Sequence, residues 1–177
     1  MRLFMSIPLP QLCVNELIRI QQLLKASAHF EGSFVAPENF HITLAFFGSV
    51  SDDEYKTIDS ELASISYPSF TIQLKALEVN SRTHPHVLWV SLYAPMLIPL
   101  AEIIAEKLPR YKQERAFNGH ITIARIKHIH DKERFFAALN SIMLTPLLWS
   151  AREFELVSSD TLPQGPVYKV LAKYSLY

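Results

Sequence analysis

The chain has 177 residues, of which 49% are apolar, and its 17 basic residues balance 17 acidic ones. This apolar fraction supports a packed interior and excludes a disordered chain. A net charge of zero argues against broad, non-specific nucleic-acid binding, which requires clustered positive charge, but it is compatible with a nucleotide or RNA end held in a local pocket.

The first half of the chain alternates strands and helices. One predicted helix carries Leu17, Ile20, Leu23 and Leu24 on one face. The next one starts at Ser51, where Glu54 completes the pattern of a capping box. The predicted elements are strands at 2–7, 33–36, 39–47, 70–79 and 86–93 and helices at 11–27 and 51–64.

The second half repeats this order. Its predicted elements are helices at 95–108 and 131–142 and strands at 120–126, 154–159 and 167–174, the last two joined by a turn at 163–166. Several strands follow one another directly, without a strict βαβ rhythm. This favours an α+β fold with antiparallel sheets, as one domain over residues 1–177.

The composition also limits the chemistry and the location. The only cysteine, Cys13, lies in a predicted helix, which excludes an internal disulfide and favours buried packing over a nucleophile. The first eight residues contain too short an apolar run for a signal peptide, and no stretch of 18 apolar residues occurs. We therefore expect a cytoplasmic protein without a membrane segment.

Two segments resemble each other more than any others in the chain. Residues 41–45 and 120–124 both read His-Ile-Thr-aliphatic-Ala. Because strand side chains alternate between faces, each segment presents its histidine, threonine and alanine on one face and apolar residues, Phe46 included, on the other. The residues expected on the shared polar faces are His41, Thr43 and Ala45, and His120, Thr122 and Ala124.

This pattern suits the hydrolysis of a phosphate diester. If the two strands face each other across a cleft, two imidazoles and two hydroxyls converge. A neutral imidazole can accept a proton from water, an imidazolium can donate one to the leaving oxygen, and the hydroxyls can donate to phosphate oxygens. Such chemistry requires no metal. A lone strand histidine is more often structural, so the signal is the matched pair.

Other residues have competing interpretations. Two His-x-His pairs could chelate a metal, but they lie in predicted loops or at strand ends without a carboxylate at ligand spacing, so we expect no metal site. These pairs are His84 with His86 and His128 with His130. Three phenylalanines could stack on a base, although packing in the core is favoured: Phe4, Phe47 and Phe117.

With both motifs in view, the chain resembles the 2H phosphoesterases, and within them the RNA 2',3'-cyclic phosphodiesterases, historically called 2'-5' RNA ligases. The similarity covers nearly the whole chain. It is carried by residues 1–10, 35–48, 87–90, 117–125 and 168–174. The chain departs from the family in having Phe34 where a tryptophan is common, and Asn118-Gly119 where Arg-Pro commonly precedes the second histidine.

The resemblance implies a bilobal, pseudo-twofold α+β fold in which antiparallel sheets line a central cleft and helices lie outside. It implies hydrolysis of a terminal 2',3'-cyclic phosphate to a 2'-phosphate, without metal or cofactor. In it His41 is the proton donor, His120 is the proton acceptor, and Thr43 and Thr122 hold phosphate oxygens. Arg125 would add a fixed positive charge, but strict alternation places it on the apolar face, so it needs a bulge or a strand end to reach the site.

The partners implied are an RNA or oligonucleotide with a 2',3'-cyclic phosphate end, or nucleotides, and the resemblance favours a monomer. Reversible 2'-5' ligation is a further implied reaction. Two alternatives stay open: a 2H phosphodiesterase acting on small cyclic nucleotides or 2'-5' linkages, and a non-catalytic RNA-end binding module. The matched histidines argue against the second alternative, because binding alone does not require two titratable groups.

Overall fold

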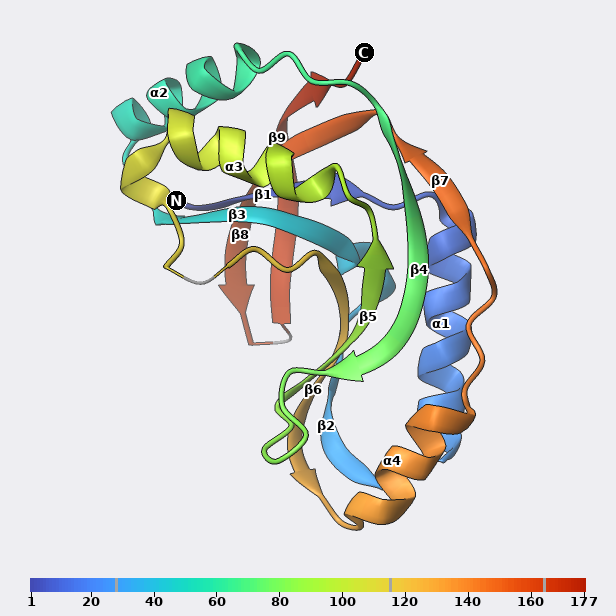
Figure 1. The fold of residues 1–177 in the computed structure, drawn as a ribbon. Helices are drawn as coiled ribbons and strands as arrows, with labels where there is room; N and C mark the ends of the chain where they lie inside the picture. The colour runs from blue at the N-terminus through green and yellow to red at the C-terminus, as the bar shows by residue number, and fades with distance from the viewer. Residues whose placement is uncertain (28, 115, 164) are drawn as a thin grey trace.

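The computed structural model describes residues 1–27, 29–114, 116–163 and 165–177 (Figure 1). Two curved sheets form the body of the protein, and the helices lie outside them. No helix within the described residues is long and apolar enough to cross a membrane. In chain order the elements are β1 (Arg2–Pro8), α1 (Gln11–Ala26), β2 (Phe30–Phe34), the 3-10 turn η1 (Pro37–Asn39), β3 (His41–Ser49), α2 (Asp52–Ala63), β4 (Phe70–Val79), β5 (Val87–Tyr93), α3 (Leu97–Lys107), the 3-10 turn η2 (Pro109–Tyr111), β6 (His120–Ile129), α4 (Lys132–Ser141), β7 (Leu148–Ala151), β8 (Glu153–Leu162) and β9 (Gly165–Ser175).

All strand pairs are antiparallel, which confirms the predicted α+β class. The first sheet has the strand order β3-β1-β8-β9, and the second has the order β2-β6-β5-β4-β7. The lobes are therefore interleaved along the chain: β2 joins the second sheet, and the C-terminal hairpin of β8 and β9 returns to the first. Neither lobe is a continuous segment of sequence.

Most predicted elements are present, with shifted boundaries. The capping box of α2 is confirmed, since Ser51 accepts from the backbone of Glu54 and the Glu54 side chain accepts in return. The predicted strand at 33–36 is instead β2, which starts earlier because Phe30 is buried in the core. The short strand β7 was not predicted. Residue 164 of the predicted turn at 163–166 lies outside the described residues.

Helix α1 packs its apolar face into the core, where Leu17, Ile20 and Leu24 are almost completely buried. The prediction for Leu23 was wrong, because it is 40% exposed at the edge of this face. Cys13 is fully buried, and this burial together with the charge of Glu16 raises the pKa of its thiol to about 12. At neutral pH the thiol is therefore protonated and weakly nucleophilic, as its predicted packing role requires.

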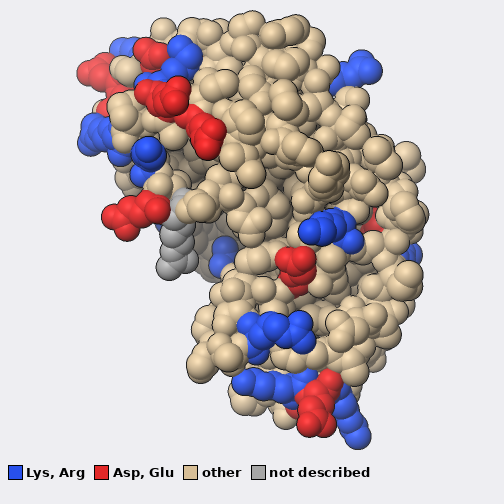
Figure 2. Space-filling model, in the orientation of Figure 1, with Lys and Arg blue, Asp and Glu red and all other residues tan. Residues whose placement is uncertain are grey.

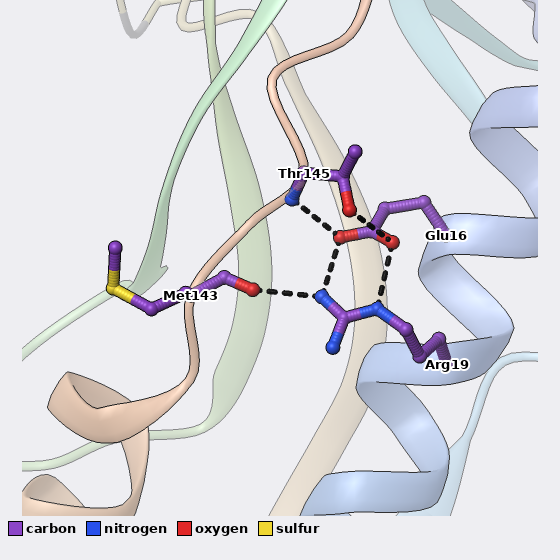
Figure 3. A network of polar contacts seen from close by, with 4 residues as sticks. All are labelled: Glu16, Arg19, Met143 and Thr145. Carbon is purple, nitrogen blue, oxygen red and sulfur yellow. Dashed lines mark hydrogen bonds and ion pairs between the residues drawn. The ribbon is translucent and has the colours of Figure 1, made fainter.

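A buried carboxylate ties α1 to the segment between α4 and β7 (Figure 3). Glu16 accepts two hydrogen bonds from Arg19, at 2.8 and 2.7 Å. It also accepts from the backbone N–H and the hydroxyl of Thr145, at 2.7 and 3.0 Å. Arg19 in turn donates to the carbonyl of Met143 at 2.7 Å. Four donors on one carboxylate offset the cost of burying its charge.

We predict that Glu16→Gln lowers the free energy of unfolding by about 1–3 kcal/mol, because charge-assisted bonds to a buried group are lost. The Arg19 and Thr145 bonds hold the pKa of Glu16 below its ordinary 4.5 despite burial. Its stabilising contribution is therefore present above pH 4.5 and is lost as pH falls through the lowered value. Denaturant titrations at several pH values measure both effects.

The matched control is Glu102→Gln, at an exposed position of α3, which should leave the unfolding free energy within about 0.5 kcal/mol. Equal stability of the Glu16 variant and wild type at pH 7 would contradict the proposed stabilising role of this network.

Candidate active site

The two motif strands meet at the boundary between the sheets. β3 is the edge strand of the first sheet, β6 lies in the second, and the two are in contact. Figure 2 shows the molecular surface hollowed between the upper part, which carries α2 and α3, and the lower part, which carries α4. The histidine and threonine of each motif are half-buried while the isoleucine between them is fully buried, as strand alternation predicts: His41, Ile42, Thr43, His120, Ile121 and Thr122.

Each imidazole is anchored by the backbone carbonyl two residues earlier. Nδ1 of His41 lies 2.8 Å from the carbonyl oxygen of Asn39, and Nδ1 of His120 lies 2.8 Å from that of Asn118. A carbonyl oxygen can only accept, so geometry assigns the proton to Nδ1 in both rings. Nε2 is then the nitrogen free to exchange a proton. In His41 it lies 2.9 Å from the hydroxyl of Thr43, which donates to it in the neutral ring.

Aromatic side chains pack against both imidazoles. The ring of Phe4 lies 4.9 Å from that of His41, and Tyr168 meets His41 edge-on at 5.4 Å. On the opposite sheet, Trp89 packs against His120 at 4.5 Å. With the carbonyl anchors, these contacts restrict the rotation of each ring. Neither Tyr168 nor Trp89 was predicted as a site residue, because spacing along the chain does not show that they face the histidines.

The two histidines interact electrostatically. Burial lowers the pKa of His41 below 6.5, the positive charge of His120 lowers it further, and the carbonyl of Asn39 acts in the opposite direction. Protonation of His120 therefore disfavours protonation of His41. The strands that carry the two rings, β3 and β6, are in contact.

A β-bulge turns Arg125 towards the cleft. Val87 pairs with Arg125 and Trp89 pairs with Thr122, so β6 contains one extra residue between these pairs. Val87 and Trp89 share a face of β5, so Arg125 and Thr122 share a face of β6. Arg125 is exposed, and its charge opposes the rise in the pKa of Tyr168 that burial causes. Arg125 needed a bulge in order to face the site, and this bulge is present.

The same bulge overturns the expectation for Ala124. This alanine was predicted beside His120 and Thr122, but it is fully buried in the core. Irregular pairing of β1 with β3 likewise overturns the expectations for Ala45 and Phe46. Ala45 pairs with fully buried Met5 and packs against the core, whereas Phe46 pairs with Phe4 on the cleft face and is 57% exposed. Phe47 takes the core position. Because register depends on the partner strand, strict alternation could not predict these exceptions.

The remaining candidates from the sequence lie in different surroundings. The described residues contain no group of three or more His, Cys, Asp or Glu side chains that could hold a metal ion. His128 and His130 are exposed, with rings 5.1 Å apart, and His130 contacts Glu31 at 3.2 Å. Of the three phenylalanines weighed for base stacking, Phe47 is buried in the core and Phe117 packs against it, whereas Phe4 contacts His41.

A two-sheet α+β fold with a His-x-Thr strand from each sheet defines a two-histidine phosphoesterase. A family model described as LigT-like phosphoesterase matches residues 7–89 and 93–168. The chain therefore belongs to the LigT-like phosphoesterase family.

Named relatives agree with this assignment. The RNA 2',3'-cyclic phosphodiesterase of Methanocaldococcus jannaschii is 28% identical over 178 residues, covering 98% of this chain and 100% of that protein. The protein of the same name from Thermotoga maritima is 31% identical over 183 residues, covering 97% and 93%. The crystal structure of Escherichia coli LigT complexed with 3'-AMP aligns with a TM-score of 0.77 at 26% identity, covering 99% of this chain and 97% of that one.

We predict that an NMR titration of His41 shows a pKa below 6.5, and that His120→Gln raises it, because the substitution removes a neighbouring positive charge. His130→Gln, just beyond the far end of β6, is the control and should leave the titration unchanged. An unchanged pKa of His41 in the His120 variant would show that the two rings do not interact in solution.

Proposed function

We propose that this protein hydrolyses 2',3'-cyclic phosphate ends of RNA to 2'-phosphates. The observation that carries the proposal is the pair of imidazoles, each anchored through Nδ1 so that Nε2 can exchange a proton, on two strands from different sheets that are in contact. The names of the relatives and the 3'-AMP complex of Escherichia coli LigT support a substrate with a nucleotide end.

In the proposed reaction His120 is the proton acceptor. Its neutral Nε2 takes a proton from a water molecule, and the water oxygen attacks the phosphorus of the cyclic ester. A new P–O bond forms as the bond from phosphorus to the ribose 3' oxygen breaks. Trp89 packs against the ring of His120 and so holds it in position for this step.

His41 is the proposed proton donor. Its protonated Nε2 gives a proton to the 3' oxygen as that oxygen leaves. The positive charge that His120 gains lowers the pKa of His41, so uptake of a proton on one side promotes release on the other. In the free protein the hydroxyl of Thr43 lies at Nε2, at the place where the leaving oxygen would be received.

The remaining groups stabilise charge on the phosphate. We propose that Thr43 and Thr122 donate hydrogen bonds to its non-bridging oxygens, and that Arg125 supplies the fixed positive charge. Proton transfer and charge stabilisation are then both provided by side chains, so the proposed reaction uses no metal or cofactor. Both histidines come from one chain, so the site requires no second copy.

The same groups can join two RNA ends. If the 5' hydroxyl of a second RNA replaces water as the attacking group, a new P–O bond forms as the bond to the 3' oxygen breaks, and the two RNAs are joined through a 2'-5' linkage with the same roles for His41 and His120. In the reverse of this ligation the donor and acceptor roles exchange, and reversible ligation is part of the proposal. An RNA with a 2',3'-cyclic phosphate end is the proposed physiological partner in hydrolysis and in ligation.

We predict that His41→Ala and His120→Ala each lower the turnover of a 2',3'-cyclic phosphate substrate by about 10²–10⁴-fold, the scale of a general acid or base. His128→Ala, at an exposed position of the same strand β6, is the matched control and should retain wild-type turnover. Near-wild-type turnover by either folded active-site variant, or loss of activity in EDTA that zinc restores, would contradict the mechanism.

We predict that the product carries its phosphate at the 2' position, because the 3' oxygen is the proposed leaving group. Phosphorus NMR of the product from a 2',3'-cyclic mononucleotide distinguishes a 2'-phosphate from a 3'-phosphate. A 3'-phosphate would contradict the proposed orientation of the ribose while leaving two-histidine chemistry intact. The absence of turnover on every cyclic phosphate tested would instead favour a binding module.

A further inference from the structure

A pocket of about 530 Å³ opens beside His41, away from the second motif. Its floor is the cleft face of the first sheet, and its walls come from the first half of α1 and from η1. Apolar groups dominate the lining, among them Val157, Tyr168 and Val170 from the sheet and Val14, Ile18 and Pro37 from the walls. A cavity of this size and character suits a flat, mostly apolar group of nucleobase dimensions.

Strand register arranges polar groups in a row across this floor. Ser6 pairs with Thr43 on one side and with Glu155 on the other, and Glu155 pairs with Lys173. Partners in register point to the same face, so the row leads from the first motif into the pocket. Two strand spacings, or about 9.5 Å, separate Thr43 from Glu155. This matches the reach from the phosphate of a nucleotide to the far edge of its base.

Glu155 is the unusual member of this row, because it is 7% exposed and still lines the pocket. Lys173 lies 2.9 Å from Oε1 of Glu155, and it shares its charge between Glu155 and Glu153. Within the described part of the chain, no side chain or backbone group donates to Oε2. Ser6 is also buried at 2% exposure and lines the pocket beside it. A buried carboxylate with an available oxygen is an acceptor that an uncharged ligand can use.

We propose that this pocket binds the base of the terminal nucleotide, and that Glu155 accepts hydrogen bonds from the ring N–H and amino group of guanine. The inference rests on the proposed function, since it is the cyclic phosphate at His41 that directs the base into the pocket. Guanine presents two adjacent donors on one edge, which match a carboxylate. Uracil flanks its single N–H with carbonyl oxygens, which a carboxylate repels.

Equilibrium binding of guanosine 2'-phosphate and uridine 2'-phosphate, measured by titration calorimetry, tests the proposal without requiring turnover. Wild-type protein should bind the guanosine compound at least about tenfold more tightly, the scale of hydrogen bonds to a charged group. Glu155→Gln should remove this preference. Glu153→Gln is the matched control, because Glu153 also bonds Lys173, at 2.7 Å, but does not line the pocket; it should keep the preference.

A second pair of variants serves if Glu155→Gln fails to fold. Val170 and Val167 lie on the same strand and are similarly exposed, at 44% and 48%, but only Val170 lines the pocket. Val170→Phe should fill the pocket and remove the preference for guanosine, while Val167→Phe should not.

Equal binding of the two nucleotides by wild-type protein, or equal losses in the Glu155 and Glu153 variants, would overturn the proposal. Turnover of 2',3'-cyclic GMP and 2',3'-cyclic UMP by the same preparations separates this failure from that of the proposed function. Turnover without any base preference in binding would contradict the pocket assignment and leave the proposed function intact. Base-selective binding that depends on Glu155, without turnover, would support the base pocket and contradict the proposed phosphodiesterase activity.

Discussion

A backbone carbonyl that accepts from Nδ1 of each histidine is the contact on which the site depends. It selects the tautomer, orients the ring and leaves Nε2 free to exchange a proton in the cleft. Because the acceptor belongs to the backbone, the side chains at positions 39 and 118 do not supply it. This explains how Asn118-Gly119 can stand where related proteins commonly have Arg-Pro, with the imidazole geometry of the two motifs still matched.

Irregular strand pairing does the rest of the positioning. A regular β6 would direct Arg125 into the core and Ala124 into the cleft, whereas the bulge reverses both and adds a cation to the histidine face. On β3, irregular pairing exposes Phe46 beside Phe4 and places Phe47 in the core. Each motif strand therefore alternates regularly through its His-Ile-Thr segment and changes face only after it, which extends the cleft surface beyond the two motifs.

The sequence was sufficient to predict the motif strands, the antiparallel α+β class and the capped start of α2, because each rests on local pattern. It was insufficient for properties that depend on contacts with another strand or with the core. The face of Arg125 depends on β5, and the early start of β2 depends on the burial of Phe30. The contact of Tyr168 with His41 joins β9 to β3, which are not neighbours in the sheet.

The neutral composition of the chain is compatible with this architecture. A phosphate diester carries one negative charge, and the proposed site meets it with Arg125 and one imidazolium, brought together from two sheets. In the adjoining pocket Lys173 contacts Glu155, and it also contacts Glu153, which does not line the pocket. The positive charge of the proposed site is therefore local, since 17 acidic residues balance 17 basic ones over the chain as a whole. A neutral protein can in this way attract a single phosphate end without attracting the length of a nucleic acid, whose affinity grows with each neutralised phosphate.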